Sequence, residues 1–167
     1  WTSYCSQIYR SMNRAMRQRD EVGLGLWRPL IYHLNAALDK LDKRPAKVYR
    51  GLAKAPPERY GVGRIVTWPA FSPSSQDPRI ALDFMSLGTD NTPDLRGANT
   101  VGTVVVVETC WAYDVAAYSL YPEECEALLP PNSVFVVVER LGDEHRDLLG
   151  AATDTVYLKQ IDRLEVP

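Results

Sequence analysis

Two glutamates separated by one residue are the clearest candidates for chemistry in this sequence. They are Glu124 and Glu126, in the stretch YPEECEALLPP, where acidic residues run into apolar residues and a double proline. Side chains alternate along a strand, so an extended segment 124–128 would place both carboxylates on one face and pack Cys125 and Ala127 on the other. Like charges so close raise the pKa of one carboxyl group. Such a pair either faces water at a strand entrance or serves glycosyl chemistry, in which one carboxylate stabilises a cationic sugar and the other positions or deprotonates a nucleophile.

The catalytic interpretation requires an anion-binding partner, and Arg50 in VYRGL is placed for that role. A strand arginine can bind phosphate with two hydrogen bonds, and Gly51 would let a ligand approach the backbone. Ser74 and Ser75 follow an aromatic residue in WPAFSPSSQDPRIALDF, where their hydroxyls could bond a ribose or orient a glutamate. Each feature alone is also consistent with a structural role: Arg50 with an ordinary surface arginine, and Ser74 and Ser75 with a Ser/Pro turn. Their order along the chain, each at a strand end, favours one common site.

The composition is that of a globular domain and argues against several classes of protein. The 167 residues are 46% hydrophobic and 24% charged, with a net charge of -2, which argues against a duplex-binding surface. Arg10, Arg14, Arg17 and Arg19 have near-helical spacing and are expected to form a solvated helix face. The three cysteines and two histidines do not have the spacing of metal ligands, so no metal site is expected. The cysteines are also too few for a disulfide framework, although the sequence allows one disulfide. No apolar run is long enough to span a bilayer.

The secondary-structure elements that must position these residues are expected to be two N-terminal helices followed by a series of strands. Apolar spacing predicts helices over 1–18 and 27–41, with Gly23 and Gly25 breaking the chain between them. The strands expected after the helices, with one short helix at 77–85, are 47–52, 64–68, a buried central strand at 101–108, 125–129, 133–139 and 154–166, which closes the sheet. This order predicts an α+β fold rather than a repeating βαβ order. The polar segment 88–99 is long enough to be functional.

The chain is expected to be one domain, with N-terminal helices in 1–42 and a β core in 46–167. It opens abruptly with Trp1, and we expect an excised domain or a processed form. The compartment stays open, with a secreted protein or a delivered effector favoured over a cytoplasmic one.

Four motifs in this order resemble the arginine-type mono-ADP-ribosyltransferases, the Arg-Ser-Glu branch shared by vertebrate ecto-enzymes and cholera- or iota-like bacterial toxins. WTSYCSQIYRSMNRAMR resembles the opening helix of the family, and VYRGL resembles its NAD-binding arginine strand. AFSPSSQDPRIALDF resembles the Phe-x-Ser-Thr-Ser strand with the helix after it, and AYSLYPEECEALLPPNSVFVV resembles the Glu-x-Glu turn. The resemblance covers nearly the whole chain. It implies a split β-sandwich of two packed, mainly antiparallel sheets with N-terminal helices.

The resemblance also implies NAD as co-substrate, no metal, and a protein arginine as acceptor. Arg50 would hold the NAD phosphates, Glu126 would stabilise the cationic transition state, and Glu124 would orient or deprotonate the acceptor guanidinium. Arginine is implied as acceptor because the first residue of the pair is Glu rather than Gln. Ser75 would take the last position of the Ser-Thr-Ser set and act in catalysis. Further contacts with NAD are implied for Gly51, Ser72, Ser74, Phe84 and, in the loop 88–99, Arg96. Tyr118 and Tyr121 would recognise the protein substrate.

One position departs from the family pattern. Pro73 stands where the family has the first serine of the set, and a proline donates no side-chain hydrogen bond. Either Ser72 substitutes after a local shift or the site works with fewer hydrogen bonds, which would cost about one to two decades in rate. Two alternatives to transfer also stay open: an NAD glycohydrolase on the same fold, and a catalytically silent module that binds a nucleotide or a protein.

Overall fold

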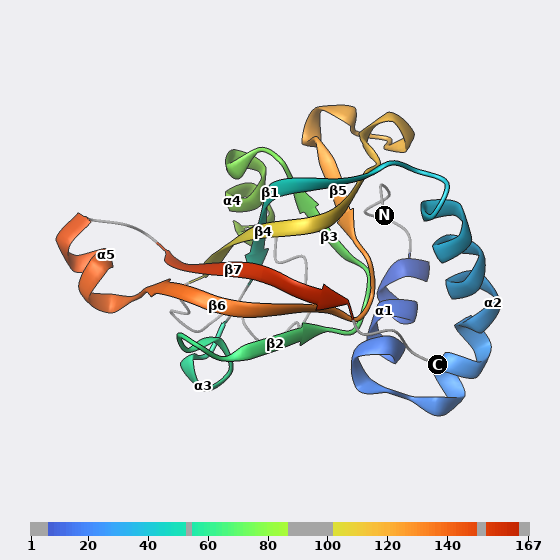
Figure 1. Ribbon diagram of the computed structural model, residues 1–167, viewed down its shortest axis with the longest axis horizontal. Helices are drawn as coiled ribbons and strands as arrows, with labels where there is room; N and C mark the ends of the chain where they lie inside the picture. The colour runs from blue at the N-terminus through green and yellow to red at the C-terminus, as the bar shows by residue number, and fades with distance from the viewer. Residues whose placement is uncertain (1–6, 53–54, 87–101, 150–152, 164–167) are drawn as a thin grey trace.

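Two helices open the described chain and seven strands follow, so the predicted α+β class is confirmed (Figure 1). The computed structural model describes residues 7–52, 55–86, 102–149 and 153–163. Its long helices are α1 (Ile8–Gln18) and α2 (Glu21–Leu38). The short helices are α3 (Pro57–Tyr60), α4 (Pro78–Ser86) and α5 (Asp143–Leu149), and two 3-10 turns are η2 (Ala116–Tyr118) and η3 (Pro122–Glu124). The strands are β1 (Lys43–Leu52), β2 (Ile65–Trp68), β3 (Ser72–Ser75), β4 (Thr103–Asp114), β5 (Glu126–Leu129), β6 (Ser133–Leu141) and β7 (Asp154–Arg163).

The break between the two long helices lies at Arg19 and Asp20, and the expectation of a break at the glycines is wrong. Arg19 adopts a left-handed conformation with φ 53°, and the Asp20 carboxylate accepts a 3.2 Å hydrogen bond from the N–H of Val22. Gly23 lies inside α2, where an added Cβ would stand only 2.9 Å from the Cβ of Ala15 in α1. The glycine therefore serves close helix packing, which offsets its low helix propensity.

The inner faces of α1 and α2 pack against one end of the strands (Figure 1). The buried residues of this contact are Met12, Met16, Leu38, Ala70, Phe71, Tyr113 and Leu128. One polar group fixes the contact, because the buried side-chain amide of Asn13 donates a 3.0 Å hydrogen bond to the carbonyl of Phe71. The N-terminal helix is thereby anchored directly before β3.

The strands form one hydrogen-bonded network in the order β1-β3-β5-β4-β7-β6-β2, with a further pairing of β1 and β4. Two branches leave the antiparallel β1–β4 pair: one continues through β7 and β6 to β2, and the other runs through β5 and β3 back to β1. The predicted split sandwich therefore consists of two branches that share β1 and β4. All pairings are antiparallel except β4–β7.

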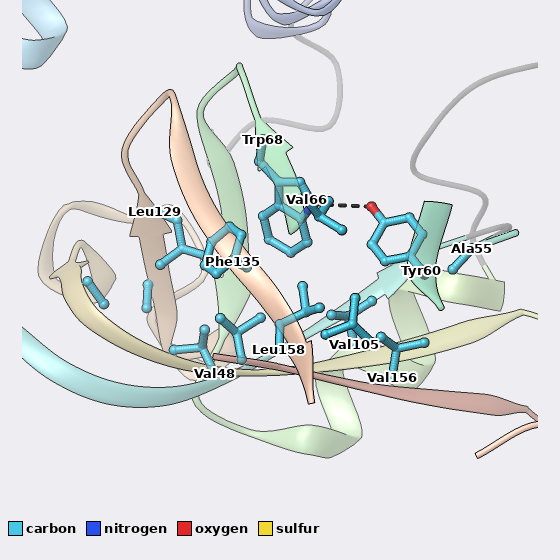
Figure 2. Packing of buried hydrophobic residues seen from close by; sticks show 14 residues of the cluster. Val48, Ala55, Tyr60, Val66, Trp68, Val105, Leu129, Phe135, Val156 and Leu158 are labelled. Atoms are coloured by element: carbon cyan, nitrogen blue, oxygen red, sulfur yellow. Dashed lines mark hydrogen bonds between the residues drawn. The ribbon is translucent and has the colours of Figure 1, made fainter. Parts of the chain in front are cut away.

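The main core lies between these branches, as Figure 2 shows. Val105 and Val107 of the valine-rich β4 are fully buried, so the predicted central strand is confirmed. Leu129 packs against them from β5, in one branch, while Phe135 of β6 and Trp68 of β2 pack against them from the other branch. β7, the strand that the sequence predicts to close the sheet, lies inside it between β4 and β6, and β2 forms the edge. Within the described ranges, no helix has both the length and the apolar character needed to cross a membrane.

Candidate functional site

The Glu124–Glu126 segment is a turn that leads into a strand, not one continuous strand. Glu124 ends η3, Cys125 is left-handed with φ 47°, and β5 begins only at Glu126. The expectation of an extended 124–128 is therefore wrong, and Cys125 is exposed rather than packed. The physical reason is the 3-10 turn that starts at Pro122, whose carbonyl accepts a 3.1 Å hydrogen bond from the N–H of Cys125.

The charge of Glu124 nevertheless acts on Glu126. Glu126 is buried, with only 6% of its surface exposed, whereas Glu124 is partly exposed. Burial raises the pKa of Glu126 above its ordinary value of 4.5, and the negative charge of Glu124 raises it further. The expected raised pKa within the pair is confirmed, although loss of hydration contributes more than charge repulsion.

Ser75 joins the strand before the site to the Glu-x-Glu turn. It lies directly opposite Glu126 in the antiparallel β3–β5 pair, so the two side chains share one face. Its hydroxyl donates a 2.7 Å hydrogen bond to the carbonyl of Glu124 and accepts one of 2.9 Å from the N–H of Asp77. One hydroxyl therefore connects β3, the end of η3 and the start of α4.

Arg50 reaches the same strand from the other side. Its guanidinium donates a hydrogen bond to the carbonyl of Pro73, two residues before Ser75, and stands 5.8 Å from the centre of the Trp68 ring. β3 lies between β1 and β5, so strand spacing alone puts the backbones of Arg50 and Glu126 about 10 Å apart. The fold thus places Arg50, Ser75 and Glu126 on three neighbouring strands.

The serine set of β3 has a different hydrogen-bond pattern from the one that the family implies. The β3–β5 register is regular from Ser72 to Ser75. The Ser72 hydroxyl donates to the carbonyl of Ala70 at 3.1 Å, while the buried hydroxyl of Ser74 has no hydrogen-bond partner in the described part of the chain. The carbonyl of Pro73 accepts the hydrogen bond from the Arg50 guanidinium.

A cleft of about 250 Å³ opens beside Arg50. Its lining residues are Arg17, Arg50, Leu52, Pro56, Arg59, Tyr60, Trp68, Pro69, Ala70 and Ser72. Of the predicted site residues that the structure describes, Arg50 and Ser72 line this cleft, whereas Ser75 and Glu126 are not among its lining residues.

Arg17 lines the cleft, although its spacing in the sequence predicted only a solvated helix face. It is solvent-exposed, as expected for the arginine face of α1, but that face borders the cleft. Asn13, four residues earlier, marks the buried side of the same helix, so the spacing of Asn13 and Arg17 was a usable signal. Arg59, Tyr60 and Trp68 had no such signal, because only the folded chain brings α3 and β2 to Arg50.

The other residues predicted to contact NAD or the protein substrate lie in β1, near the turns η2 and η3, and in or after α4. Gly51 lies half-buried in β1, beside Arg50. Tyr118 ends η2 and is 71% exposed, and Tyr121 directly precedes η3. Phe84 belongs to α4, but its side chain lies outside the described residues, as do Arg96 and the whole loop 88–99. Among the described residues, no group of three His, Cys, Asp or Glu side chains could hold a metal ion.

Comparisons with known proteins place the chain in a family. A family model described as NAD:arginine ADP-ribosyltransferase matches residues 1–153. Ecto-ADP-ribosyltransferase 5 of Bos taurus is 27% identical over 165 residues, which are 89% of this chain and 46% of the relative. The chain therefore spans less than half the length of that curated relative.

Solved structures show the same fold. The ADP-ribosyltransferase Vis, a toxin from Vibrio splendidus, superposes in its agmatine complex with a TM-score of 0.69 at 20% identity, covering 92% of this chain and 68% of Vis. The eukaryotic mono-ADP-ribosyltransferase ART2.2 superposes with a TM-score of 0.65 at 22% identity, covering 98% of this chain and 64% of ART2.2. Because the family model spans most of the sequence, the chain belongs to the NAD:arginine ADP-ribosyltransferase family.

Proposed function

We propose that this chain transfers ADP-ribose from NAD to the guanidinium of a protein arginine and releases nicotinamide. The observation that carries the proposal is the arrangement of Arg50, Ser75 and Glu126 on three adjacent strands, tied together through Pro73 and Glu124. Family membership supports the reaction class, and Vis, a relative in fold, has been solved with agmatine, a small guanidinium compound.

The cleft supplies the binding energy for NAD in this proposal. Arg50 and Arg17 line it from β1 and α1, and guanidinium groups pair with phosphate oxygens through strong, charge-assisted hydrogen bonds. None of the described residues that line the cleft is acidic. The dinucleotide would extend from the cleft across Ser72 and Pro73 towards the glutamates.

Glu126 would act on the sugar. As the bond between the nicotinamide nitrogen and C1′ breaks, its electron pair leaves with nicotinamide and the ribose becomes oxocarbenium-like. A fixed carboxylate stabilises that charge without reorganisation, and burial strengthens the interaction. Glu124, presented on the turn before it, would orient the incoming guanidinium and accept the proton lost when the new bond to C1′ forms.

A turnover assay with two products tests the proposal. The chain is incubated with NAD labelled in its adenosine half and with agmatine or an arginine-rich protein, and both released nicotinamide and incorporated label are measured. We expect both in the wild type, neither in Glu126→Gln, and in Glu124→Ala nicotinamide release to water with transfer lost.

Three results would contradict parts of this proposal. Undiminished nicotinamide release by Glu126→Gln removes the mechanism, and equal loss of both activities in Glu124→Ala means that the two roles are misassigned. Label recovered mainly as free ADP-ribose identifies a glycohydrolase, and calorimetric binding of NAD without any product identifies a silent module.

A further inference from the structure

A short segment between β1 and β2 supplies part of the wall of the cleft. Pro56, Arg59 and Tyr60 line the cleft, and all three belong to residues 55–60, which include the helix α3. α3 has only 4 residues, too few for a helix to keep its shape through its own hydrogen bonds. The position of this wall therefore depends on contacts at the two ends of the segment.

The two ends of the segment are held by different strands. At its end, the Tyr60 ring is buried in the main core, and its hydroxyl accepts a 3.1 Å hydrogen bond from the indole N–H of Trp68, the ring beside Arg50 (Figure 2). At its beginning, the carbonyl of Ala55 accepts a 2.7 Å hydrogen bond from the guanidinium of Arg140, which lies 85 residues later in β6. Within the described ranges, this is the hydrogen bond that joins the beginning of the wall to the sheet.

Arg140 is itself fixed by a buried carboxylate. In the β6–β7 pair it lies opposite Val156, whose side chain is buried in the main core, so the arginine projects from the core face of the sheet. Its guanidinium donates a 2.8 Å hydrogen bond to the buried carboxylate of Asp154 in β7. The planar guanidinium donates in two fixed directions at once, here to Asp154 and to Ala55. Arg140 therefore joins β7 to the wall of the cleft.

Arg146 of α5 provides an internal comparison. It also pairs with Asp154, through the other carboxylate oxygen, and with Asp143. The side chains of Arg140 and Arg146 are similarly buried, at 16% and 20% exposed. None of the contacts that the structure describes for Arg146 reaches residues 55–60. The two arginines therefore share one carboxylate, but only Arg140 contacts the wall of the cleft.

We propose that Arg140 is a positioning residue for NAD binding: anchored on Asp154, it holds the Ala55 carbonyl and with it the wall formed by residues 55–60. The inference rests on the proposed function, because it concerns how the same cleft holds the dinucleotide. Arg140 is not among the lining residues, so it acts through the wall and not on the ligand. Without it, the wall loses a charge-assisted hydrogen bond at its beginning. The two glutamates lie beyond this contact, on η3 and β5, so the loss falls on binding rather than on the chemical step.

Binding and kinetics of four proteins test this role. The wild type, Arg140→Ala, Arg140→Lys and Arg146→Ala are compared by calorimetry with NAD, by the KM and kcat of nicotinamide release, and by urea unfolding. We expect Arg140→Ala to raise the Kd and KM for NAD about tenfold, with kcat within about twofold. Arg140→Lys keeps a cation beside Asp154 but not the two-direction fork, so it should recover most of the free energy of unfolding and only part of the affinity. Arg146→Ala should also lower the free energy of unfolding, because it removes an ion pair with Asp154, but it should leave the KM unchanged.

The outcomes separate this inference from the function on which it rests. If NAD is turned over and Arg140→Ala lowers the free energy of unfolding without changing the Kd or KM, the ion pair is only structural and the inference is overturned. An equal rise of the KM in Arg140→Ala and Arg146→Ala also overturns it, because a general loosening then explains both. If Arg140→Ala does not fold, Arg140→Lys is judged by the same comparison with Arg146→Ala. If the wild type binds NAD without forming products, the proposed transfer fails and the Kd values still decide the role of Arg140. If the wild type binds no NAD, both proposals fail.

Discussion

The hydroxyl oxygen of Ser75 lies 2.7 Å from the carbonyl oxygen of Glu124, although 49 residues separate them in the sequence. The same hydroxyl accepts a hydrogen bond from the N–H of Asp77 at the start of α4. The turn that presents Glu124 is therefore held by the strand that faces Glu126, and the position of Glu124 relative to Glu126 depends on one side chain.

Replacing Ser75 with alanine should loosen this turn. The loss of a partly buried hydrogen bond lowers the free energy of unfolding by about 1 kcal/mol. Transfer to arginine should fall about tenfold more than nicotinamide release, because Glu124 moves while Glu126 stays in β5. Urea denaturation and the two-product assay measure these effects. Ser133→Ala, which also removes a 2.7 Å hydrogen bond to a carbonyl, is the control that loses stability alone. A parallel fall of both activities in Ser75→Ala would contradict this role.

The acid limb of the pH–rate profile should lie above the ordinary glutamate range. Burial and the charge of Glu124 raise the pKa of Glu126, and only the ionised carboxylate stabilises a cationic sugar. The kcat/KM for nicotinamide release should therefore rise as the pH increases, and the midpoint of this rise should lie above pH 4.5. Glu124→Gln should move the midpoint down but not below 4.5, since burial, the larger cause, remains. If the midpoint of Glu124→Gln equals that of the wild type, a group other than Glu126 sets the acid limb.

The same shift predicts how stability depends on pH. The folded-state pKa of Glu126 lies above the unfolded value, so the folded protein keeps this proton longer. Its contribution to stability is fully present below about pH 4.5 and is lost as the pH rises through the raised pKa. Glu126→Gln should thus gain stability relative to the wild type at pH 7 and gain none at low pH. Urea titrations at both pH values check this. A loss of stability in Glu126→Gln at pH 7 would mean that interactions with the ionised carboxylate offset the cost of burying its charge.

Ser74→Ala should separate stability from binding. The Ser74 hydroxyl is buried and has no hydrogen-bond partner among the described residues, so its removal should leave the free energy of unfolding unchanged or raise it by about 1 kcal/mol. If the hydroxyl bonds the ribose of NAD, the KM for NAD should rise about tenfold in the same variant. Unchanged NAD kinetics would remove Ser74 from the binding set.

Arg17 and Arg14 allow a matched comparison on one helix. Both are exposed on α1, but only Arg17 lines the cleft. Arg17→Ala should raise the KM for NAD about tenfold or more through the loss of a charge-assisted hydrogen bond, with little change in kcat. Arg14→Ala, whose side chain bonds Gln18 at 3.4 Å, should leave the KM within about twofold. Equal effects of the two substitutions would point to a general charge effect rather than to a contact.

Much of the fold could be predicted because local patterns agree with it. Apolar spacing located both N-terminal helices, and the valine run located the central strand β4. The exceptions have tertiary causes. Gly23 remains helical because α1 and α2 approach closely there, and β7 enters the middle of the sheet because its partners β4 and β6 are distant in sequence.

For the candidate site, the sequence was sufficient to identify which groups are available and in what order: Arg50, the serines of β3, and the two glutamates. Side-chain chemistry and chain order are local properties, so they can be read residue by residue. The folded chain was needed to show that Glu124 lies on a turn held by Ser75, and that Arg17 and Arg59 border the cleft beside Arg50. Those relationships depend on how separate elements pack, since burial and long-range pairing set both the geometry of a site and the pKa of its acids.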